Sequence, residues 1–305
     1  MARRRKGRQL DGWVIIDKPA GISSSAIVNK VKWVLDANKA GHAGTLDPEA
    51  TGLLAIALGE ATKTVPWVMD TLKAYDFRVR LGQATNTDDA EGEVIASSEQ
   101  RPSREEIENA LQNFIGDIDQ VPPKFSAIKI DGERAYAKAR EGEDVELKPR
   151  PLFVDELRLI EQPDDDHADL HLVCGKGGYV RSIARDLGEA LGCFGHVKTL
   201  RRVWSGPFSL ADHGTEYEIF NCPDKTPELD THILPIEIAL RDVAEIEISE
   251  PNLRAIQHGN SIVPFAADLD HGQEAWVSYN GFAIALGTFE AGSFFPSRVL
   301  NRALP

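Results

Sequence analysis

The sequence predicts an α+β protein with a mixed, mostly antiparallel sheet and flanking helices, followed by a small C-terminal domain built mainly from strands. Strand-like segments recur among helical ones without the regular alternation that a doubly wound parallel sheet requires. Near residue 241 the chain changes character, and short β-rich pieces then lie between glycines. A chain of 305 residues is long enough for one large domain or two ordinary ones.

The N-terminal third predicts a strand, a helix and a second strand. Residues 13–16 form a short apolar run, and the serines at 23–25 supply an N-cap for the helix that follows. Residues 73–81 alternate between apolar and polar side chains, which is typical of a half-buried strand. The helix places its apolar side chains near one stripe: Ile27, Val31, Val34 and Leu35.

The rest of the sequence predicts further helices and strands. Ser103 and Glu106 match a capping box that opens a helix to about Phe114, and two prolines at 122–123 then break the chain. The apolar residues of segment 179–191 follow helical spacing. An acidic, proline-containing stretch suggests a linker or irregular connection at 212–240. Further strands are expected at 152–161, 170–174, 245–248, 275–279 and 282–288, and a small helix near 253–258.

The composition is that of an ordinary globular protein, with 42% hydrophobic and 27% charged residues. No apolar run approaches the length of a membrane-spanning helix, and the basic N-terminus lacks the apolar stretch of a secretory signal. The three cysteines show no CxxC spacing, which disfavours a disulfide framework and a cysteine-based zinc site. We therefore expect a reducing, cytoplasmic location.

Basic residues gather in two short segments of this acidic chain, whose formal net charge is −14. Residues 1–9 carry five basic side chains and no acid, and residues 176–202 carry six against two acids. Such patches allow an acidic protein to bind a polyanion at one defined place. A short basic tail is also common as a solubilising or disordered end, and both interpretations stay open.

The most distinctive segment, residues 41–52, surrounds Asp47 with three glycines and a proline. The glycines, at 41, 44 and 52, are expected to allow tight turns, and Pro48 to stiffen the exit. A carboxylate in such a loop serves as a nucleophile, a general base, a metal ligand or a helix N-cap. The simplest interpretation is the cap, with Pro48 as the first helical residue.

Five segments resemble the TruB family of bacterial tRNA pseudouridine-55 synthases, in family order over roughly 200 residues. They are residues 17–24, 40–54, 73–92, 122–142 and 174–202. Segments 253–265 and 287–300 are similar to a PUA domain, an RNA-binding β-barrel. The resemblance implies a basic tail at 1–10, a pseudouridine synthase catalytic domain at 11–240 and a PUA-like RNA-binding domain at 241–305. Arg185 departs from the family pattern, because some members carry an acid there.

The reaction that the resemblance implies is isomerisation of uridine to pseudouridine at position 55, in the T-loop of tRNA. The base flips out, the N1–C1′ bond breaks, and C5 then bonds to C1′. Because no electrons or groups enter from outside, we expect no cofactor and no metal. We expect tRNA, through its T-stem-loop, as the partner, with no membrane and no obligatory protein or guide RNA, and a monomeric protein.

By the same resemblance Asp47 is the essential carboxylate, Arg181 its cationic neighbour, and Tyr75 the ring that stacks on the flipped uracil. Attack of Asp47 on the base, attack on C1′ and a glycal route all stay open. A carboxylate with a reference pKa of about 4 ionises easily where a cation offsets its burial. From the residues alone, Tyr75 is equally a core side chain, and Arg181 a phosphate contact or surface residue.

The remaining candidates are also carried over from the family. His42 fills the gap that the flipped base leaves, and Tyr179 packs beside Tyr75. A further set supplies pocket lining, support or phosphate contacts, although its last two members equally fit plain surface charges: Lys18, Pro19, Lys63, Leu200, Arg201 and Arg202.

Three other functions compete with this interpretation. A tRNA-folding chaperone or RNA-binding protein on the same scaffold is disfavoured by the retained set of Asp47, Tyr75 and Arg181. A guide-RNA-dependent enzyme of the same superfamily is disfavoured because segment 122–150 matches stand-alone bacterial enzymes better. An unrelated hydrolase that uses Asp47 and Glu49 has no further support.

Overall fold

A computed structural model describes residues 7–126, 129–130, 133–134, 147–264 and 268–303. The chain divides into two compact units. The first unit holds residues 1–48, 52–70 and 205–305, and the second holds residues 49–51 and 71–204. Most of the family-like segment 122–142 and residues 1–6 of the basic tail lie outside the described residues.

The first unit contains strands in the order β14-β1-β3, with β2 (Ala40–His42) also paired to β3. Strand β1 (Gly12–Lys18) runs antiparallel to β3 (Thr51–Leu58) and parallel to β14 (Thr215–Glu216). Successive residues of β1 enter two different cores, and those of β3 do the same. Because both faces are covered, these strands read as unbroken apolar runs instead of alternating patterns.

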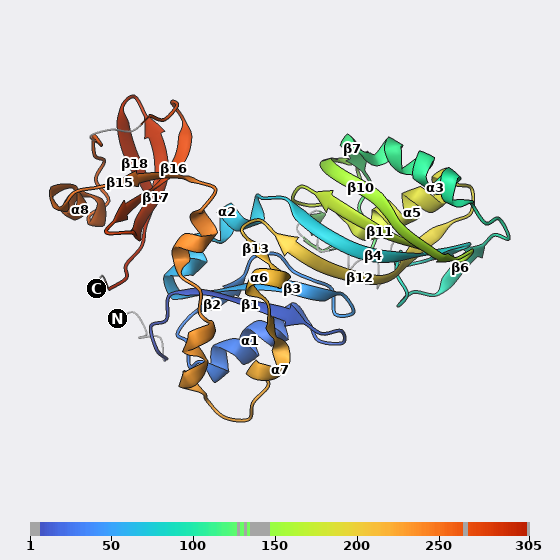
Figure 1. The fold of residues 1–305 in the computed structure, drawn as a ribbon, viewed down its shortest axis with the longest axis horizontal. Coiled ribbons are helices and arrows are strands. Elements are labelled where there is room, and N and C mark those ends of the chain that lie inside the picture. The colour runs from blue at the N-terminus through green and yellow to red at the C-terminus, as the bar shows by residue number, and fades with distance from the viewer. Residues whose placement is uncertain (1–6, 127–128, 131–132, 135–146, 265–267, 304–305) are drawn as a thin grey trace. The chain divides into compact units, whose positions relative to one another are not determined.

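Helix α1 (Ser24–Val34) and the short helix α7 (Tyr217–Phe220) lie on one face of this sheet (Figure 1). The side chain of Ser23 accepts a hydrogen bond from the Ala26 N–H, which confirms the predicted N-cap. The predicted apolar stripe is buried throughout. The strand expected at 13–16 is also confirmed, and it extends over the full length of β1.

The stretch 212–240 is an irregular connection, which is one of the two structures predicted for it. The other prediction, a linker, is wrong. Its short helices insert Tyr217, Phe220, Ile236 and Leu240 into the cores on both faces of the sheet. Seven acidic residues and three prolines among these 29 residues conceal the few buried positions.

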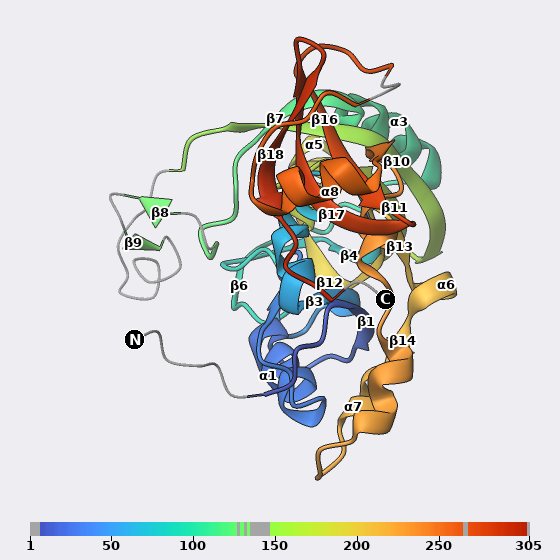
Figure 2. The same ribbon diagram turned by 90° about the vertical axis from the view of Figure 1, so that its left-hand side faces the viewer.

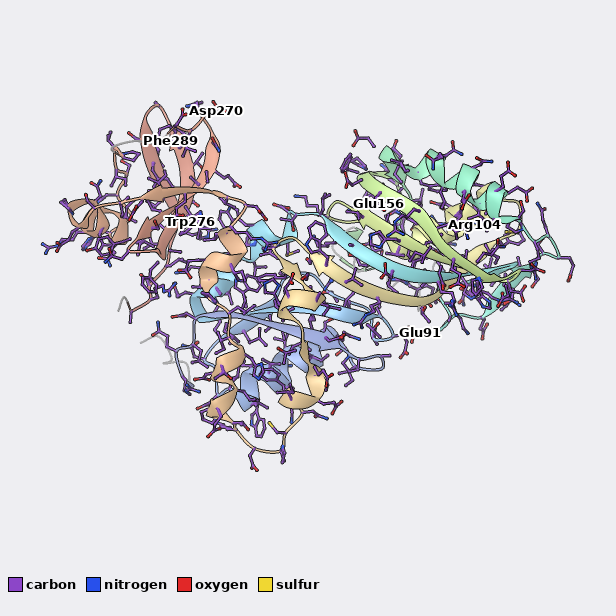
Figure 3. All side chains as sticks on the ribbon, viewed as in Figure 1. Glu91, Arg104, Glu156, Asp270, Trp276 and Phe289 are labelled. Atoms are coloured by element: carbon purple, nitrogen blue, oxygen red, sulfur yellow. The ribbon has the colours of Figure 1, made fainter. Side chains whose placement is uncertain are left out.

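The C-terminal strands form a four-stranded sheet in the order β15-β16-β17-β18 (Figure 1). Figure 2 shows β16, β17 and β18 of this sheet together with α8. The first pair is parallel and the other two pairs are antiparallel. Trp276 and Phe289, marked in Figure 3, belong to its two central strands. The predicted strands and helix are confirmed, but the last strand was not predicted, since Pro296 interrupts its apolar pattern. The elements are β15 (Ala244–Glu247), α8 (Glu250–Gln257), β16 (Gln273–Tyr279), β17 (Phe282–Glu290) and β18 (Ser293–Val299).

The second unit is a sheet in the order β12-β4-β11-β10-β7, with α3 and α5 packed on one face (Figure 1). Tyr75, Phe77, Val79 and Leu81 are buried, so the predicted alternation of the strand at 73–81 is confirmed. The capping box before α3 is also present. The elements are β4 (Lys73–Leu81), α3 (Arg104–Leu111), β7 (Gly116–Gln120), β10 (Arg150–Asp164), β11 (His167–Cys174), α5 (Val180–Ala190) and β12 (Gly195–Ser205).

These observations confirm an α+β fold with a mixed sheet. No helix among the described residues is long and apolar enough to cross a membrane. The remaining elements are η1 (Gly59–Lys63), α2 (Val65–Met69), β5 (Gln83–Thr85), β6 (Val94–Ser97), η2 (Gln112–Phe114), β8 (Lys129–Ile130), β9 (Glu133–Arg134), β13 (Phe208–Ser209), α6 (Leu210–His213), η3 (Pro227–His232) and η4 (Ile236–Leu240).

Candidate active site

Asp47 lies in the loop between β2 and β3, and no helix follows it. The interpretation of Asp47 as a helix N-cap is therefore wrong. The residues after the loop pack alternately into two cores as a strand, and this burial outweighs a local helix-start signal. Gly44 (φ 95°) and Gly52 (φ 97°) adopt the left-handed backbone expected of them. Gly41 does not, and an added Cβ there would meet open space.

The backbone just before Asp47 is fixed by a buried serine. Ser24 Oγ donates to the Leu46 carbonyl over 2.8 Å and accepts from the Leu46 N–H over 2.9 Å. Asp47 itself is exposed. Asp47 is thus an exposed residue on an anchored loop, where a bound substrate can cover it.

The backbone just after Asp47 is fixed by Lys18, whose side chain is fully buried. Lys18 Nζ donates to the carbonyl of Pro48 over 2.6 Å and to that of Pro19 over 2.9 Å. The Gly21 N–H also donates to the Pro48 carbonyl, over 3.0 Å. These bonds give Lys18 a supporting role in the Asp47 loop.

Replacing Lys18 with methionine is expected to lower the free energy of unfolding by about 2–3 kcal/mol, because two carbonyls then lose a charged donor. Urea denaturation measures this loss. Lys198→Met is a matched control, since Lys198 is exposed and surface substitutions usually change stability by no more than about 0.5 kcal/mol. A loss no larger than that of the control would show that Lys18 does not brace the loop.

Arg181 occupies the first turn of α5, and its guanidinium is enclosed by the protein. Nη1 donates to Asp89 Oδ2 over 3.2 Å and to the Thr87 carbonyl over 3.3 Å. Nη2 donates to the Phe125 carbonyl over 3.1 Å. Only 11% of the side chain is exposed, so the interpretation of Arg181 as a plain surface residue is wrong.

Asp89, which holds Arg181, was not identified from the sequence. Its other carboxylate oxygen accepts from Thr87 Oγ1 over 2.5 Å and from the Glu91 N–H over 3.1 Å, in the loop marked by Glu91 in Figure 3. A Cβ on Gly92 would lie 2.3 Å from Thr87 Oγ1, so this loop requires glycine there. The run of Asn, Thr, Asp and Gly at 86–92 could have indicated this loop from the sequence, because such residues form turns through hydrogen bonds from their side chains to the backbone.

The start of α5 is held by a second residue that sequence reasoning missed. Gln120 is buried at the end of β7, where its Oε1 accepts from the Tyr179 N–H over 2.9 Å. Its Nε2 donates back to the Tyr179 carbonyl over 3.1 Å. This reciprocal pair fixes the N-cap residue of the helix that carries Arg181. Nothing in the sequence distinguishes Gln120 from an ordinary strand residue.

Further along α5, three charged side chains form a partly buried group. Arg185 donates to Asp88 over 3.1 Å and to Asp186 over 2.8 Å. Burial raises the pKa of both carboxyl groups above its ordinary value, although Arg185 opposes that rise. Burial also works against the charge of Arg185, but the two carboxylates outweigh it and raise the pKa of the guanidinium. Arg185, which departs from the family pattern, is therefore bonded to two acids.

Tyr75 is 8% exposed and belongs to the core of the second unit. Tyr75 therefore packs in the core, as its simpler interpretation predicts. The role of Tyr75 in the reaction stays a prediction. Leu200 is half-buried against the same core, on β12. Its carbonyl accepts from Thr51 Oγ1 over 3.3 Å. His42 is half-buried on β2 of the first unit.

Lys63 and Arg202 are both engaged within the protein. Lys63 Nζ donates to Glu60 Oε2 and to the Val299 carbonyl, each over 2.6 Å, and Glu60 in turn accepts from the Asn301 N–H. Arg202 is 1% exposed, so the interpretation of it as a surface charge is wrong. Arg201 is half-buried. The roles of Lys63 and Arg202 toward RNA stay predictions.

The candidate residues fall into two groups, one in each unit. The first unit holds Lys18, Pro19, His42, Asp47 and Lys63, and the second holds Tyr75, Tyr179, Arg181, Leu200, Arg201 and Arg202. Within the described ranges, no cluster of three or more histidine, cysteine or acidic side chains is arranged to hold a metal ion.

Comparison with known sequences shows which family combines these elements. Residues 32–180 match the model of the TruB family pseudouridylate synthase N-terminal domain, and residues 181–241 match that of the tRNA pseudouridylate synthase B C-terminal domain. A tRNA pseudouridine synthase B of Ruegeria pomeroyi is 60% identical over 302 residues, which cover 99% of each chain. The chain belongs to the TruB family. Another TruB-family relative, from Dinoroseobacter shibae, is 61% identical over 301 residues, again 99% of each chain.

Two solved structures share the fold of this TruB-family chain. A Cbf5-Nop10-Gar1 complex matches with a TM-score of 0.74 and 24% identity, over 95% of this chain and 84% of that one. An H/ACA RNP bound to a substrate RNA containing 2'-deoxyuridine matches with a TM-score of 0.74 and 20% identity, over 99% of this chain and 92% of that one. At these identities the likeness shows the fold alone.

Proposed function

We propose that this protein isomerises uridine to pseudouridine at position 55, in the T-loop of tRNA, and that Asp47 is its essential carboxylate. Membership of a family of pseudouridylate synthases supports the reaction type, and the names of the full-length relatives support tRNA as the substrate. The observation that carries the role of Asp47 is its anchored loop. Buried side chains bind the backbone of both neighbours, and Asp47 itself is an exposed residue.

An anchored but accessible carboxylate suits attack on a nucleotide that arrives from solution. The loop needs no reorganisation when substrate binds, which lowers the entropic part of the barrier. A flipped nucleotide that covers Asp47 displaces water and strengthens each electrostatic interaction of the carboxylate. Arg181, fixed by Asp89 and two carbonyls, supplies a positive charge that needs no rearrangement during the reaction.

The other candidates take supporting roles in this proposal. Tyr75 stacks on the flipped uracil, with Tyr179 beside it, and His42 fills the gap in the T-loop. Leu200, Arg202 and Lys63 line or brace the binding surface. Lys18 braces the Asp47 loop, as its two carbonyl bonds support.

We further propose that residues 11–240 are the catalytic part and residues 241–305 a PUA-like RNA-binding module, preceded by a basic tail at 1–10. The four-stranded C-terminal sheet and its helix α8 support a compact module. In this proposal the protein needs no guide RNA and no partner protein, and it acts as a monomer.

Binding of tRNA is expected to weaken by about tenfold or more as salt rises from about 50 to about 200 mM, because basic side chains release counterions from phosphates. A filter-binding titration at several salt concentrations measures this slope. Circular dichroism at the same concentrations serves as the control for folding. A dissociation constant that does not change with salt would contradict a phosphate-dominated interface.

The test of the proposed function is incubation of the purified protein with an unmodified tRNA transcript and no other macromolecule. Mapping of the product should place pseudouridine at position 55, and a transcript with cytidine at that position should remain unmodified. Tight binding without any product would favour the chaperone. Product formed only after a guide RNA is added would favour the guide-dependent function.

A further inference from the structure

A second ion pair joins the Asp89 loop to α5, next to the contact between Asp89 and Arg181. Arg185 lies one helical turn after Arg181, and Asp88 directly precedes Asp89. Arg185 Nη1 donates to Asp88 Oδ2 over 3.1 Å. The exposed fractions of the two side chains are 21% and 14%. Two consecutive loop residues are therefore bound to two successive turns of one helix.

Asp88 makes the turn that directs Asp89 toward Arg181. Its φ of 61° lies in the left-handed region, which aspartate adopts more readily than most residues but at a cost in backbone energy. The Asp88 N–H donates to the Thr85 carbonyl over 3.3 Å, and its carbonyl accepts from the Val197 N–H over 3.1 Å. Because such a backbone persists only where its surroundings hold it, the bond to Arg185 helps to retain the turn.

Arg185 is itself held from two further directions. Its Nε donates to Asp186, on the same helix, over 2.8 Å, and its Nη2 donates to the Val121 carbonyl over 2.8 Å. Ser182 Oγ donates to that same carbonyl over 2.7 Å. The planar fork of a guanidinium suits three fixed partners, whereas the single ammonium of lysine reproduces only some of these bonds.

We propose that Asp88 and Arg185 are positioning residues, which hold Asp89 in place and thereby fix Arg181 for the reaction. This inference rests on the proposed function, in which Arg181 acts beside the reacting nucleotide. Arg185 acts on Asp89 and Arg181 through its bond to Asp88. Loss of either partner lets the turn relax, and Asp89 then holds Arg181 less firmly.

The test is a double-variant cycle on Asp88→Asn and Arg185→Gln. The control is Asp186→Asn, which makes the same charge change at a partner of Arg185 that lies outside the loop. Single-turnover formation of pseudouridine in a tRNA transcript gives the rate constant, and filter binding gives the Kd for that transcript. Circular dichroism confirms folding. If Arg185→Gln does not fold, the rate constants and Kd values of Asp88→Asn and Arg185→Lys are compared instead.

We expect each single variant to lose about tenfold in rate, with a Kd within about twofold of wild type and a double variant no slower than either single one. Arg185→Lys should recover part of the rate, and Asp186→Asn should stay within about threefold of wild type. Losses that multiply in the double variant would overturn the proposal, because they would mean that the two residues act independently. A weaker Kd with an unchanged rate would also overturn it.

A second measurement reports on the Arg181 side chain and does not depend on enzyme activity. In a nitrogen–proton NMR spectrum of the arginine side chains, the Arg181 signal is identified by its loss in Arg181→Lys. We expect this signal to shift in Asp88→Asn and to stay in place in Asp186→Asn. An unmoved Arg181 signal in Asp88→Asn would overturn the positioning role. A wild-type protein that makes no pseudouridine but shows this shift would refute the proposed function and support the positioning role.

Discussion

Replacing Asp47 with asparagine is expected to lower the single-turnover rate of pseudouridine formation by about 10³-fold or more. The amide keeps the size of the side chain but loses the charge that each candidate route requires. The loop should keep its shape, because its anchoring bonds run from Ser24 and Lys18 to backbone atoms of the neighbouring residues. Rapid-quench kinetics with enzyme in excess over a tRNA transcript measures the rate.

The control for this variant is tRNA affinity, which we expect to stay within about threefold of wild type since no phosphate contact is removed. Glu49→Gln is a matched second control, because it makes the same charge change two residues further on. It should retain nearly all activity. Near-wild-type turnover by Asp47→Asn, or an equal loss in Glu49→Gln, would exclude Asp47 as the essential carboxylate.

Replacing Arg181 with methionine is expected to lower the same rate by about 10²-fold, which is typical for loss of a fixed group that stabilises developing charge. Methionine fills a similar volume, so packing at the start of α5 should be retained. Single-turnover kinetics and filter binding together separate the rate from the affinity. We expect the loss to appear in the rate, with Kd changed by less than about threefold.

Arg104→Met is the matched control, because this exposed arginine on α3 pairs, within the described part of the chain, only with Glu108 of the same helix (Figure 3). It should leave both rate and affinity unchanged. If Arg181→Met keeps its rate but binds tRNA much more weakly, Arg181 is a phosphate contact. If rate and affinity both stay near wild type, Arg181 has no part in the reaction.

Much of the fold could be predicted from the sequence wherever a segment has one buried face. The strand at 73–81 and helix α1 have polar side chains on the other face, and their periodicity is clear. Strand β3 was missed because both of its faces are covered, so it has no alternation to detect. The same burial made the helix-cap interpretation of Asp47 wrong. Strand β12 was not predicted, because the basic residues in the middle of the strand interrupt its apolar pattern and were interpreted only as part of a family motif.

The candidate site was predictable in part, and family resemblance rather than chemistry supplied most of it. The glycine-rich loop alone directed attention to Asp47. No local sequence pattern distinguishes Gln120, because its role depends on hydrogen bonds to Tyr179 at a helix start 59 residues further along the chain. The turn-forming run at 86–92 marks the loop of Asp88 and Asp89, but no local pattern encodes their bonds to Arg181 and Arg185, which lie more than 90 residues away in the chain.

The most direct test of the proposed function is tritium release from a tRNA transcript that carries 5-tritiated uridine. Wild type and Asp47→Asn are incubated side by side without guide RNA or other protein. We expect wild type to release one tritium per tRNA, from position 55, and the variant to release none while binding the transcript. No release by wild type, or equal release by both proteins, would contradict an Asp47-dependent tRNA pseudouridine synthase.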